Sequence, residues 1–537
     1  MLSATYKWTT GIFAIFSTGL LISVDSAKYV EAAYVAPPPP TFARRDITDR
    51  HGHVIATSQL AYDLWLIPED FWSISPANPR SKHREPVEAL PDTERRSRLL
   101  DILGNSPQLR SIVEGRLDAQ GKSRPRPMIL AWGITPEMAS KINASGLSGL
   151  KLLPRTIRHY PQGGLFSHTL GFVSRADSMN GQEGLELAEN HTLVGTTDNN
   201  RNAGAPLQTT LDPELQGITV QALINGVTKH GAISGAAVVV EANTGEIRAM
   251  VSSPVFDAND DASFRNPFQP ERILNQARTS FPMGSLLTPL LAAHAIETGR
   301  MQASTRIAIG KSLKLGKTRI VDVSTSDSLT LSEIVTRSSN IGQAKLALAL
   351  PLPELRDITR NLGIGEPLQI RGIPGSVDYT SVDWSEWTPA MHAQPGLHIN
   401  VNLLQALRAY LPLANGGKLA RLRLLEEERT KEPVKVLSEH SIAAMRDILS
   451  AAAGPTGTAP LAQLPGVLVA GKTGTIVATS GQPVAVFIGM APAEKPRWLI
   501  GVLLHFPLQQ PKLAGSTAAP VFASIMGKVI KSEEEAS

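Results

Sequence analysis

Five apolar, strand-like segments frame the second half of this chain, and their placement limits the folds that it can adopt. Two of them form an expected hairpin, "GAAVVVEANTGEIRAMVSS", around an Asn243-Thr244-Gly245 turn. The other three lie near the C-terminus, as "VLVAGKTGTI", "VAVFIGMAP" and "WLIGVLLHF", and "AAPVFASIMGKVI" follows them as an amphipathic helix. Strands at both ends with helices between them predict an α+β domain in which an antiparallel sheet is flanked by helices.

Helical patterns fill the interval between the two groups of strands. One helix is expected to open at Ser285, and a second helical stretch is expected from Leu331 to Leu350. Two more are expected within "LLQALRAYLPLAN" and "SEHSIAAMRDILSAAA". The first half reads differently, with strand, turn and strand in "TFARRDITDRHGHVIATSQLAYDLWLIP" and helices near Val87 to Leu103 and Pro107 to Leu117. The segment 195–206, "GTTDNNRNAGAP", is expected to connect two domains.

Composition excludes several classes of function. At 537 residues the chain is too long for a single core, so two or three folded units are expected. The formal net charge is +4 and the basic residues are scattered, which argues against nucleic-acid binding. Cysteine is absent, so disulfides and thiolate chemistry are excluded. No zinc-protease, nucleotide or dinucleotide motif occurs, and we expect neither a metal nor a cofactor.

The N-terminus carries a candidate membrane anchor. Residues 8–24 form an uncharged run of seventeen residues after Lys7. We expect an uncleaved single-pass anchor, with residues 1–7 in the cytoplasm, although a cleaved signal peptide and a buried core helix are the alternatives. Residues 25–41 follow as a linker that ends in the polyproline spacer Pro37–Pro40.

Three short stretches have the composition of an active site. Ser285 stands at the head of an apolar helix in "FPMGSLLTPLLAAHAIETG", where it is either an N-cap or a nucleophile. Ser338 and Asn340 open another helical run in "TRSSNIGQAKLAL", which is also an ordinary capping sequence. Lys472 to Thr475, "KTGT", lies in an expected strand whose glycines allow a ligand to approach the backbone.

In this order, the three stretches resemble the Ser-x-x-Lys, Ser-x-Asn and Lys-Thr-Gly motifs of the penicillin-binding serine acyltransferases. Further segments resemble the class B penicillin-binding proteins of the septal, cell-division type, and the resemblance extends over residues 42–532. These segments are "RRDITDRHGHVIA", "RHYPQGG", "HTLGFV", "GQEGLE", "VVVEANTGEIRAMVSSP", "SSNIGQAKLAL", "MAPAEKPR" and "AAPVFASIMG".

The resemblance implies a domain order and a location. An α+β pedestal (dimerisation-type) domain is expected over residues 42–205, and a D,D-transpeptidase domain over residues 206–532. The latter would contain a five-stranded antiparallel sheet and a helical subdomain, followed by a solvated tail, residues 533–537. Such proteins are single-pass bacterial inner-membrane proteins with most of the chain in the periplasm. The implied partners are peptidoglycan stem peptides, β-lactams, and membrane proteins of cell division or elongation.

The resemblance also implies roles on the helical side of the site. Ser285 would be the nucleophile that attacks the D-Ala-D-Ala carbonyl of a stem peptide and becomes acylated. Ser338 would pass a proton to the leaving amine, and Asn340 would hold the amide of the substrate.

On the strand side, Lys472 would supply positive charge to the site. Thr473, Gly474 and Thr475 would bind the terminal carboxylate region of the substrate. The backbone N–H groups of Ser285 and Thr475 would form the oxyanion hole, in which one donor contributes about 100- to 1,000-fold to the rate.

One position departs sharply from the family pattern. The family has a lysine three residues after the serine, but this chain has Thr288, with Pro289 in its expected place. A threonine hydroxyl cannot act as a general base near neutral pH, and losing a positioned base costs about 100- to 10,000-fold in rate. Pro395 before Gly396 and Asp46 in the pedestal are further departures, as is the short loop "IVATSGQP".

Two hypotheses about function follow. The first is a catalytically impaired or inactive homologue that acts as a scaffold or regulator at the site of cell-wall synthesis. The alternative is an active transpeptidase that acylates Ser285 with a non-standard base, for which Lys472 is the candidate. Other conspicuous residues are given packing roles, including Trp384 and Trp387 beside the "HAQPG" loop.

Overall fold

The computed structural model describes residues 44–536 except 72–91, 105–106, 121–126, 175–178, 195–203, 261–269, 324–325, 366–367, 375–381, 428–431, 478–480 and 509. The predicted anchor (8–24) and linker (25–41) therefore lie outside the described residues. Among the residues that are described, no helix is long and apolar enough to cross a membrane. Two compact units are present, Leu60–Arg155 in one and Thr41–Gln59 with Thr156–Ser537 in the other. The predicted domain boundary near residue 205 stays a prediction.

The smaller unit packs helices against strands. The first strand, β2, pairs antiparallel with β3 through Tyr62 to Leu66, and buried Leu64, Leu99 and Leu130 belong to its core. The two helices expected between residues 87 and 117 are present as α2 and α3, although residues 87–91 lie outside the described residues. Its elements are β2 (Val54–Leu66), α1 (Pro68–Phe71), α2 (Asp92–Ile102), α3 (Pro107–Gln120), β3 (Met128–Ile134), α4 (Pro136–Ala144) and β4 (Leu150–His159), with β2 and β4 continuing into the other unit.

In the larger unit, the expected strand–turn–strand of the pedestal region is present. Strand β1 pairs antiparallel with the start of β2 and parallel with β7. Gly52 stands in the turn at φ +84°, a left-handed conformation that favours glycine. The short elements of this region are β1 (Ile47–Thr48), α5 (Ser167–Leu170), β5 (Phe172–Val173), β6 (Gly181–Glu183), α6 (Gly184–Ala188), α7 (Asn190–Val194) and β7 (Leu207–Gln208).

A buried ionic cluster joins three of the segments that carry the family resemblance, "RRDITDR", "RHYPQGG" and "GQEGLE". The carboxylate of Glu186 is fully buried and lies 2.7 Å from Nη2 of Arg44 and 2.7 Å from Nε of Arg158. Arg44 also donates to the carbonyl of Met179 and to the side chain of Asn190. One carboxylate thus neutralises part of the charge of two buried guanidinium groups, a favourable arrangement only while all three remain.

The large sheet has the predicted five antiparallel strands, in the order β18-β19-β20-β8-β9. Its strands are β8 (Ser234–Glu241), β9 (Ile247–Ser253), β18 (Ala470–Val477), β19 (Pro483–Ala491) and β20 (Trp498–His505). The hairpin between β8 and β9 turns at the predicted place, with Gly245 at φ +73°.

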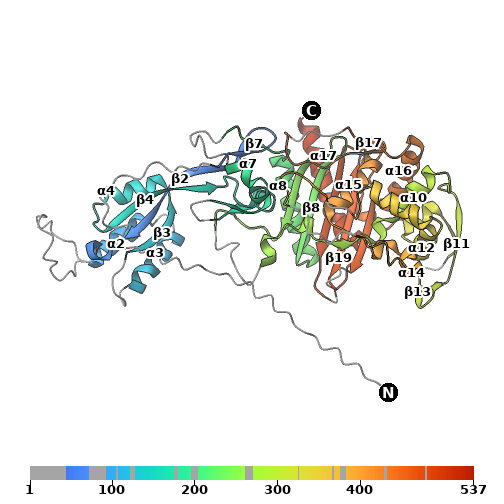
Figure 1. Cartoon of the computed structure of the whole chain (residues 1–537), viewed down its shortest axis with the longest axis horizontal. Helices are drawn as coiled ribbons and strands as arrows, with labels where there is room; N and C mark the ends of the chain where they lie inside the picture. Colours follow the sequence, from blue (N-terminus) through green and yellow to red (C-terminus); the bar gives the residue numbers. More distant parts are fainter. Residues whose placement is uncertain are drawn as a thin grey trace, which may run out of the picture. The chain divides into compact units, whose positions relative to one another are not determined.

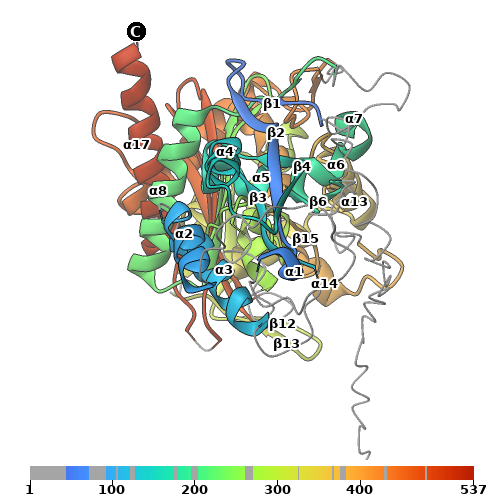
Figure 2. The same cartoon turned by 90° about the vertical axis from the view of Figure 1, so that its left-hand side faces the viewer.

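Helices cover both faces of this sheet, so its central strands are buried throughout. Alternate side chains of β8 point to opposite faces. Ala237 and Val239 belong to the core shared with α8 (Pro213–His230) and α17 (Ala518–Ala536), two helices that lie side by side in Figures 1 and 2. Val238 and Val240 belong to the core on the opposite face, with residues of α15 (Leu403–Ala414).

The helical part holds the remaining elements. Its helices are α10 (Thr288–Glu297), α11 (Leu331–Arg337), α12 (Asn340–Leu348), α13 (Leu352–Asn361), α14 (Pro389–Ala393), α15 and α16 (Glu439–Ala453). Its short strands are β10 (Phe281–Pro282), β11 (Arg306–Gly310), β12 (Leu313–Leu315), β13 (Thr318–Ile320), β14 (Ser326–Thr330), β15 (Asn400–Val401), β16 (Lys418–Leu419) and β17 (Val434–Lys435).

Three local predictions differ from the structure. The helix expected to open at Ser285 begins at Thr288, and Ser285 lies in the preceding 3₁₀ turn, Gly284–Leu286. The helical stretch expected over residues 331–350 is divided in two, because Ser338 adopts a left-handed φ of +55° and ends α11; α12 then begins at Asn340, where the second helical run was expected. The C-terminal helix α17 continues through the expected solvated tail, in which Glu534 and Glu535 are exposed and Glu533 accepts a hydrogen bond from the indole of Trp498.

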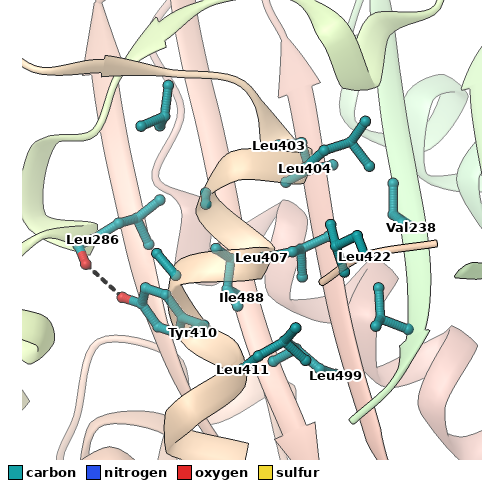
Figure 3. Close-up of a cluster of buried hydrophobic side chains, with 14 of the residues drawn as sticks. Val238, Leu286, Leu403, Leu404, Leu407, Tyr410, Leu411, Leu422, Ile488 and Leu499 are labelled. Atoms are coloured by element: carbon teal, nitrogen blue, oxygen red, sulfur yellow. Dashed lines mark hydrogen bonds between the residues drawn. The ribbon is translucent and has the colours of Figure 1, made fainter. Parts of the chain in front are cut away.

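Figure 3 shows how the core supports the turn that contains Ser285. Helix α15 directs Leu403, Leu407 and other apolar side chains into the core between the sheet and the helical part. From the same helix, the hydroxyl of fully buried Tyr410 donates a hydrogen bond of 2.6 Å to the carbonyl of Leu286. The position of the turn is therefore fixed by a side chain that belongs to the core.

The buried cluster predicts a large effect of one charge change. Glu186→Gln keeps the size of the side chain but removes the counter-charge of Arg44 and Arg158. We expect a loss of about 3–5 kcal/mol in the free energy of unfolding, measured by urea denaturation. Glu439→Gln is the control, because Glu439 and its partner Lys435 are exposed and such pairs contribute about 0–1 kcal/mol. If Glu186→Gln and Glu439→Gln lost the same small amount of unfolding free energy, Glu186 would not be the buried counter-charge of Arg44 and Arg158.

Candidate active site

Ser285 lies in a turn whose backbone is fixed from three sides. The N–H of Met283 donates to the carbonyl of Ile399 at 2.8 Å, and Tyr410 holds the carbonyl of Leu286. Gly396 packs so closely that a Cβ there would lie 2.2 Å from the carbonyl oxygen of Gly284. Any side chain at residue 396 would therefore displace the turn immediately before Ser285.

The second stretch is held by a carboxylate that the sequence analysis did not single out. Asp322 accepts hydrogen bonds from the hydroxyl of Ser339 at 2.6 Å and from the N–H of Ile341 at 2.9 Å. The amide of Asn340 donates to the carbonyl of Val321 at 3.0 Å. These contacts fix the break between α11 and α12, and the break presents the hydroxyl of Ser338 to the neighbouring strand β18.

On β18, Lys472 is completely buried. Its Nζ donates to the hydroxyl of Ser338 at 3.0 Å and to the carbonyl of Thr473 at 3.1 Å. Burial lowers the pKa of Lys472 from 10.5 to about 7, because removal from water disfavours the charged amine. Near neutral pH the amine is thus divided between its charged and neutral forms.

The two threonines of the strand occupy different surroundings. The hydroxyl of Thr473 is buried and shares a hydrogen bond of 2.8 Å with Thr458. The hydroxyl of Thr475, an exposed residue, accepts a hydrogen bond from the N–H of Ala514 at 3.1 Å.

A chain of hydrogen bonds runs from Ser285 to Lys472 through a residue that the sequence analysis missed. Nε2 of Gln343 donates to the hydroxyls of Ser285 and of Ser338, at 3.3 Å in both cases. Ser338 in turn accepts from Lys472. The spacing in the sequence could have indicated Gln343, because it follows Asn340 by three residues on α12 and therefore lies on the same side of the helix.

One pocket of about 360 Å³ is lined by half of the predicted residues. Ser285, Asn340 and Thr475 line it, as does Thr288, which is only 3% exposed. The full lining comprises Gly284, Ser285, Leu287, Thr288, Leu291, Arg319, Ile320, Val321, Asn340, Gln343, Ala393, Gln394, Pro395, Gly396, Leu397, Thr475 and Ile476.

The other predicted residues are not among the lining residues of this pocket. Ser338 and Lys472 connect to it through Gln343, and neither Thr473 nor Gly474 is among its lining residues. The individual roles predicted for these residues stay predictions, as does an oxyanion hole formed by the N–H groups of Ser285 and Thr475. Near the pocket, Trp384 and Trp387 pack against each other with ring centroids 4.6 Å apart, in agreement with the packing role expected for them.

The domain that contains this site matches a known protein family. Residues 235–527 match the penicillin binding protein transpeptidase domain, and residues 40–245 match the penicillin-binding protein dimerisation domain. The probable peptidoglycan D,D-transpeptidase PenA of Neisseria gonorrhoeae is 28% identical over 515 residues, which cover 90% of this chain and 83% of PenA. The peptidoglycan D,D-transpeptidase FtsI of Escherichia coli K12 is 26% identical, with 91% and 83% covered.

Solved structures agree with this assignment at the level of the fold. Penicillin-binding protein 3 of Mycobacterium tuberculosis, solved with aztreonam, superimposes with a TM-score of 0.67 at 21% identity and covers 92% of this chain and 96% of its own. The transpeptidase domain of Burkholderia pseudomallei penicillin-binding protein 3 gives a TM-score of 0.53 at 27% identity, with 60% of this chain and 96% of that chain covered.

The buried amine predicts a pH-dependent difference in stability. Between pH 7 and 10.5 the unfolded chain binds a proton at Lys472 that the folded chain does not, so the free energy of unfolding rises with pH in this window. Lys472→Met lacks this contribution. The free energy of unfolding of Lys472→Met, minus that of the unsubstituted chain, should therefore be highest near pH 7. This difference should fall by on the order of 3 kcal/mol by pH 10.

Chemical denaturation at a series of pH values measures this difference, because all other titrations are common to the two proteins. Lys418→Met, which removes a lysine from an exposed position, serves as the control. A difference between Lys472→Met and the unsubstituted chain that is constant from pH 7 to 10 would show that residue 472 is not buried as described.

Proposed function

This chain belongs to the class B penicillin-binding proteins, and from that premise we propose that it is a catalytically impaired or inactive D,D-transpeptidase homologue. It acts as a scaffold or regulator of peptidoglycan synthesis. Its curated relatives carry the name of peptidoglycan D,D-transpeptidases, which supports the cell-wall setting. In this proposal the activation of Ser285 is impaired, whereas the pocket that Ser285 lines still binds a peptide.

The hydrogen bonding of Ser285 carries this proposal. In the described part of the chain, its hydroxyl is bonded to the side chain of Gln343, a neutral amide that cannot take a proton near neutral pH. The position three residues after Ser285, which lines the same pocket, holds Thr288. A serine needs an adjacent base to become a nucleophile, and neither of these neighbours is one.

The same pocket is suited to binding a peptide without reacting with it. Ser285, Asn340 and Thr475 offer hydrogen-bonding groups to a ligand, while Leu287, Leu291 and other apolar residues line the remainder. The proposed ligands are peptidoglycan stem peptides and β-lactams. The proposed protein partners are membrane proteins of cell division or elongation, reached from a periplasmic position with residues 8–24 as the inner-membrane anchor.

One observation favours the alternative, an active transpeptidase. The amine of Lys472 has a pKa of about 7 and lies 3.0 Å from the hydroxyl of Ser338. A neutral amine can accept the proton of Ser338, and Ser338 could then accept a proton from the reacting groups. In the arrangement described, however, the amide of Gln343 stands between Ser338 and Ser285 and can only donate to both.

The first prediction is that a lysine at residue 288 restores reactivity. We expect the purified chain to stay unmodified after long incubation with a penicillin, and Thr288→Lys to gain one penicilloyl mass, measured by intact-protein mass spectrometry. The expected gain in rate is about 100- to 10,000-fold. Ser285→Ala in the Thr288→Lys background is the control and should abolish the added mass. If the unsubstituted chain became acylated within minutes, the proposal that it is catalytically impaired would be wrong.

The alternative makes its own prediction about pH. If Lys472 is the base, acylation of the unsubstituted chain should rise about tenfold per pH unit below pH 7 and level off above it, because only the neutral amine takes a proton. Lys472→Met should then abolish the reaction. A rate of acylation that does not change between pH 5.5 and 8.5 excludes Lys472 as the base.

A further inference from the structure

We propose that the hairpin formed by β12 and β13 is an anion-binding edge of the Ser285 pocket, which recognises a free carboxylate on an acidic peptide. The inference rests on the proposed function, since it requires a peptide in that pocket. Figures 1 and 2 show the hairpin at the periphery of the helical part, near α14. Its sequence, "KSLKLGKTRI" (residues 311–320), carries four cationic side chains within nine residues and no acidic one.

The register of the hairpin places two of these cations directly opposite each other. Lys314 pairs with Arg319 in the antiparallel ladder, and paired residues point to the same face. The opposite face carries Leu313, Leu315 and Ile320, which belong to or pack against the small core below α11 and α12. Like charges placed directly opposite each other are destabilising, so this face is better stabilised when an anion lies against both cations.

No counter-charge for the hairpin is found in the part of the chain that the structure describes. Within it, Lys311, Lys314, Lys317 and Arg319 make no ion pair with a carboxylate, whereas arginines elsewhere, such as Arg278 with Glu183, do so. The acidic residue nearest in sequence, Asp322, is occupied by Ser339 and Ile341. The charge of the hairpin thus remains available to a ligand.

The hairpin also belongs to the pocket itself. Arg319 lines the same space as Ser285 and Asn340, and it is the only charged residue among the lining residues described above. A ligand that fills this pocket therefore has one guanidinium group at its border. A guanidinium binds a carboxylate through two parallel hydrogen bonds, which gives orientation as well as attraction.

The position of Arg319 favours a peptide over other anions. A phosphate-bearing lipid surface would contact the exposed face of the hairpin without entering a pocket that is otherwise uncharged. A peptide with a carboxylate a few residues before its reacting end would place its end at Ser285 and its charge at Arg319. The ligand class that this placement favours is therefore a peptide with a free carboxylate before its reacting end.

Two fluorescently labelled peptides that differ only in charge test this proposal. They are Glu-Ala-D-Ala-D-Ala and Gln-Ala-D-Ala-D-Ala, each with the same fluorescent label on its N-terminal amine, and binding to the full-length chain is measured by fluorescence anisotropy. We expect the acidic peptide to bind about fivefold more tightly, as for a partly exposed ion pair. Arg319→Gln, and Arg319→Gln combined with Lys314→Gln, should reduce this preference to about one. The control Arg356→Gln, at an exposed position that does not line the pocket, should leave it unchanged.

Each other result overturns the proposal in a distinguishable way. If both peptides bind equally and Arg319→Gln changes neither, the carboxylate site is absent while the proposed peptide pocket stands. If neither peptide binds, the peptide pocket fails together with the inference. The last measurement is binding of the chain to vesicles that contain phosphatidylglycerol. If Arg319→Gln weakens binding to vesicles and leaves the ratio of the two peptide affinities unchanged, the hairpin binds phosphate groups at a membrane surface instead.

Discussion

The buried amine of Lys472 is the interaction on which the arrangement of this site depends. A lysine without access to water is costly unless its donors are satisfied, and here they reach the hydroxyl of Ser338 and the carbonyl of Thr473. The hydrogen bond to Ser338 holds β18, the edge strand of the sheet, against the break between α11 and α12. Ser338, which accepts a hydrogen bond from this amine, also accepts one from Gln343, and Gln343 donates a second to Ser285. The buried amine is thus connected to the pocket by a continuous set of hydrogen bonds.

Much of the fold could be predicted, because its elements follow from local periodicity. The five strands of the large sheet, the turn at Gly245 and the C-terminal helix are all determined by patterns within a dozen residues. The start of a new helical run at Ser338 and Asn340 was also predicted, but the contacts that hold the break were not, since they come from Asp322, seventeen residues away from Ser339. The end of α17 was missed for a similar reason, because Glu533 is held by distant Trp498.

Local motifs could indicate candidate residues for the site, but not the contacts between them. Short motifs identified Ser285, Ser338, Asn340 and Lys472, and three segments of the pedestal region proved to meet at Glu186. The bridging position of Gln343 and the placement of Arg319 at the pocket depend on how separate elements pack, which no local pattern encodes. Thr473 shows the converse, because its hydroxyl is occupied by Thr458 although it lies within a motif.

The close approach of Gly396 to the carbonyl of Gly284 has a consequence for how such a chain can change over generations. Folding alone restricts residue 396 to glycine, because a larger side chain there would displace the turn. This restriction therefore applies whether or not Ser285 reacts.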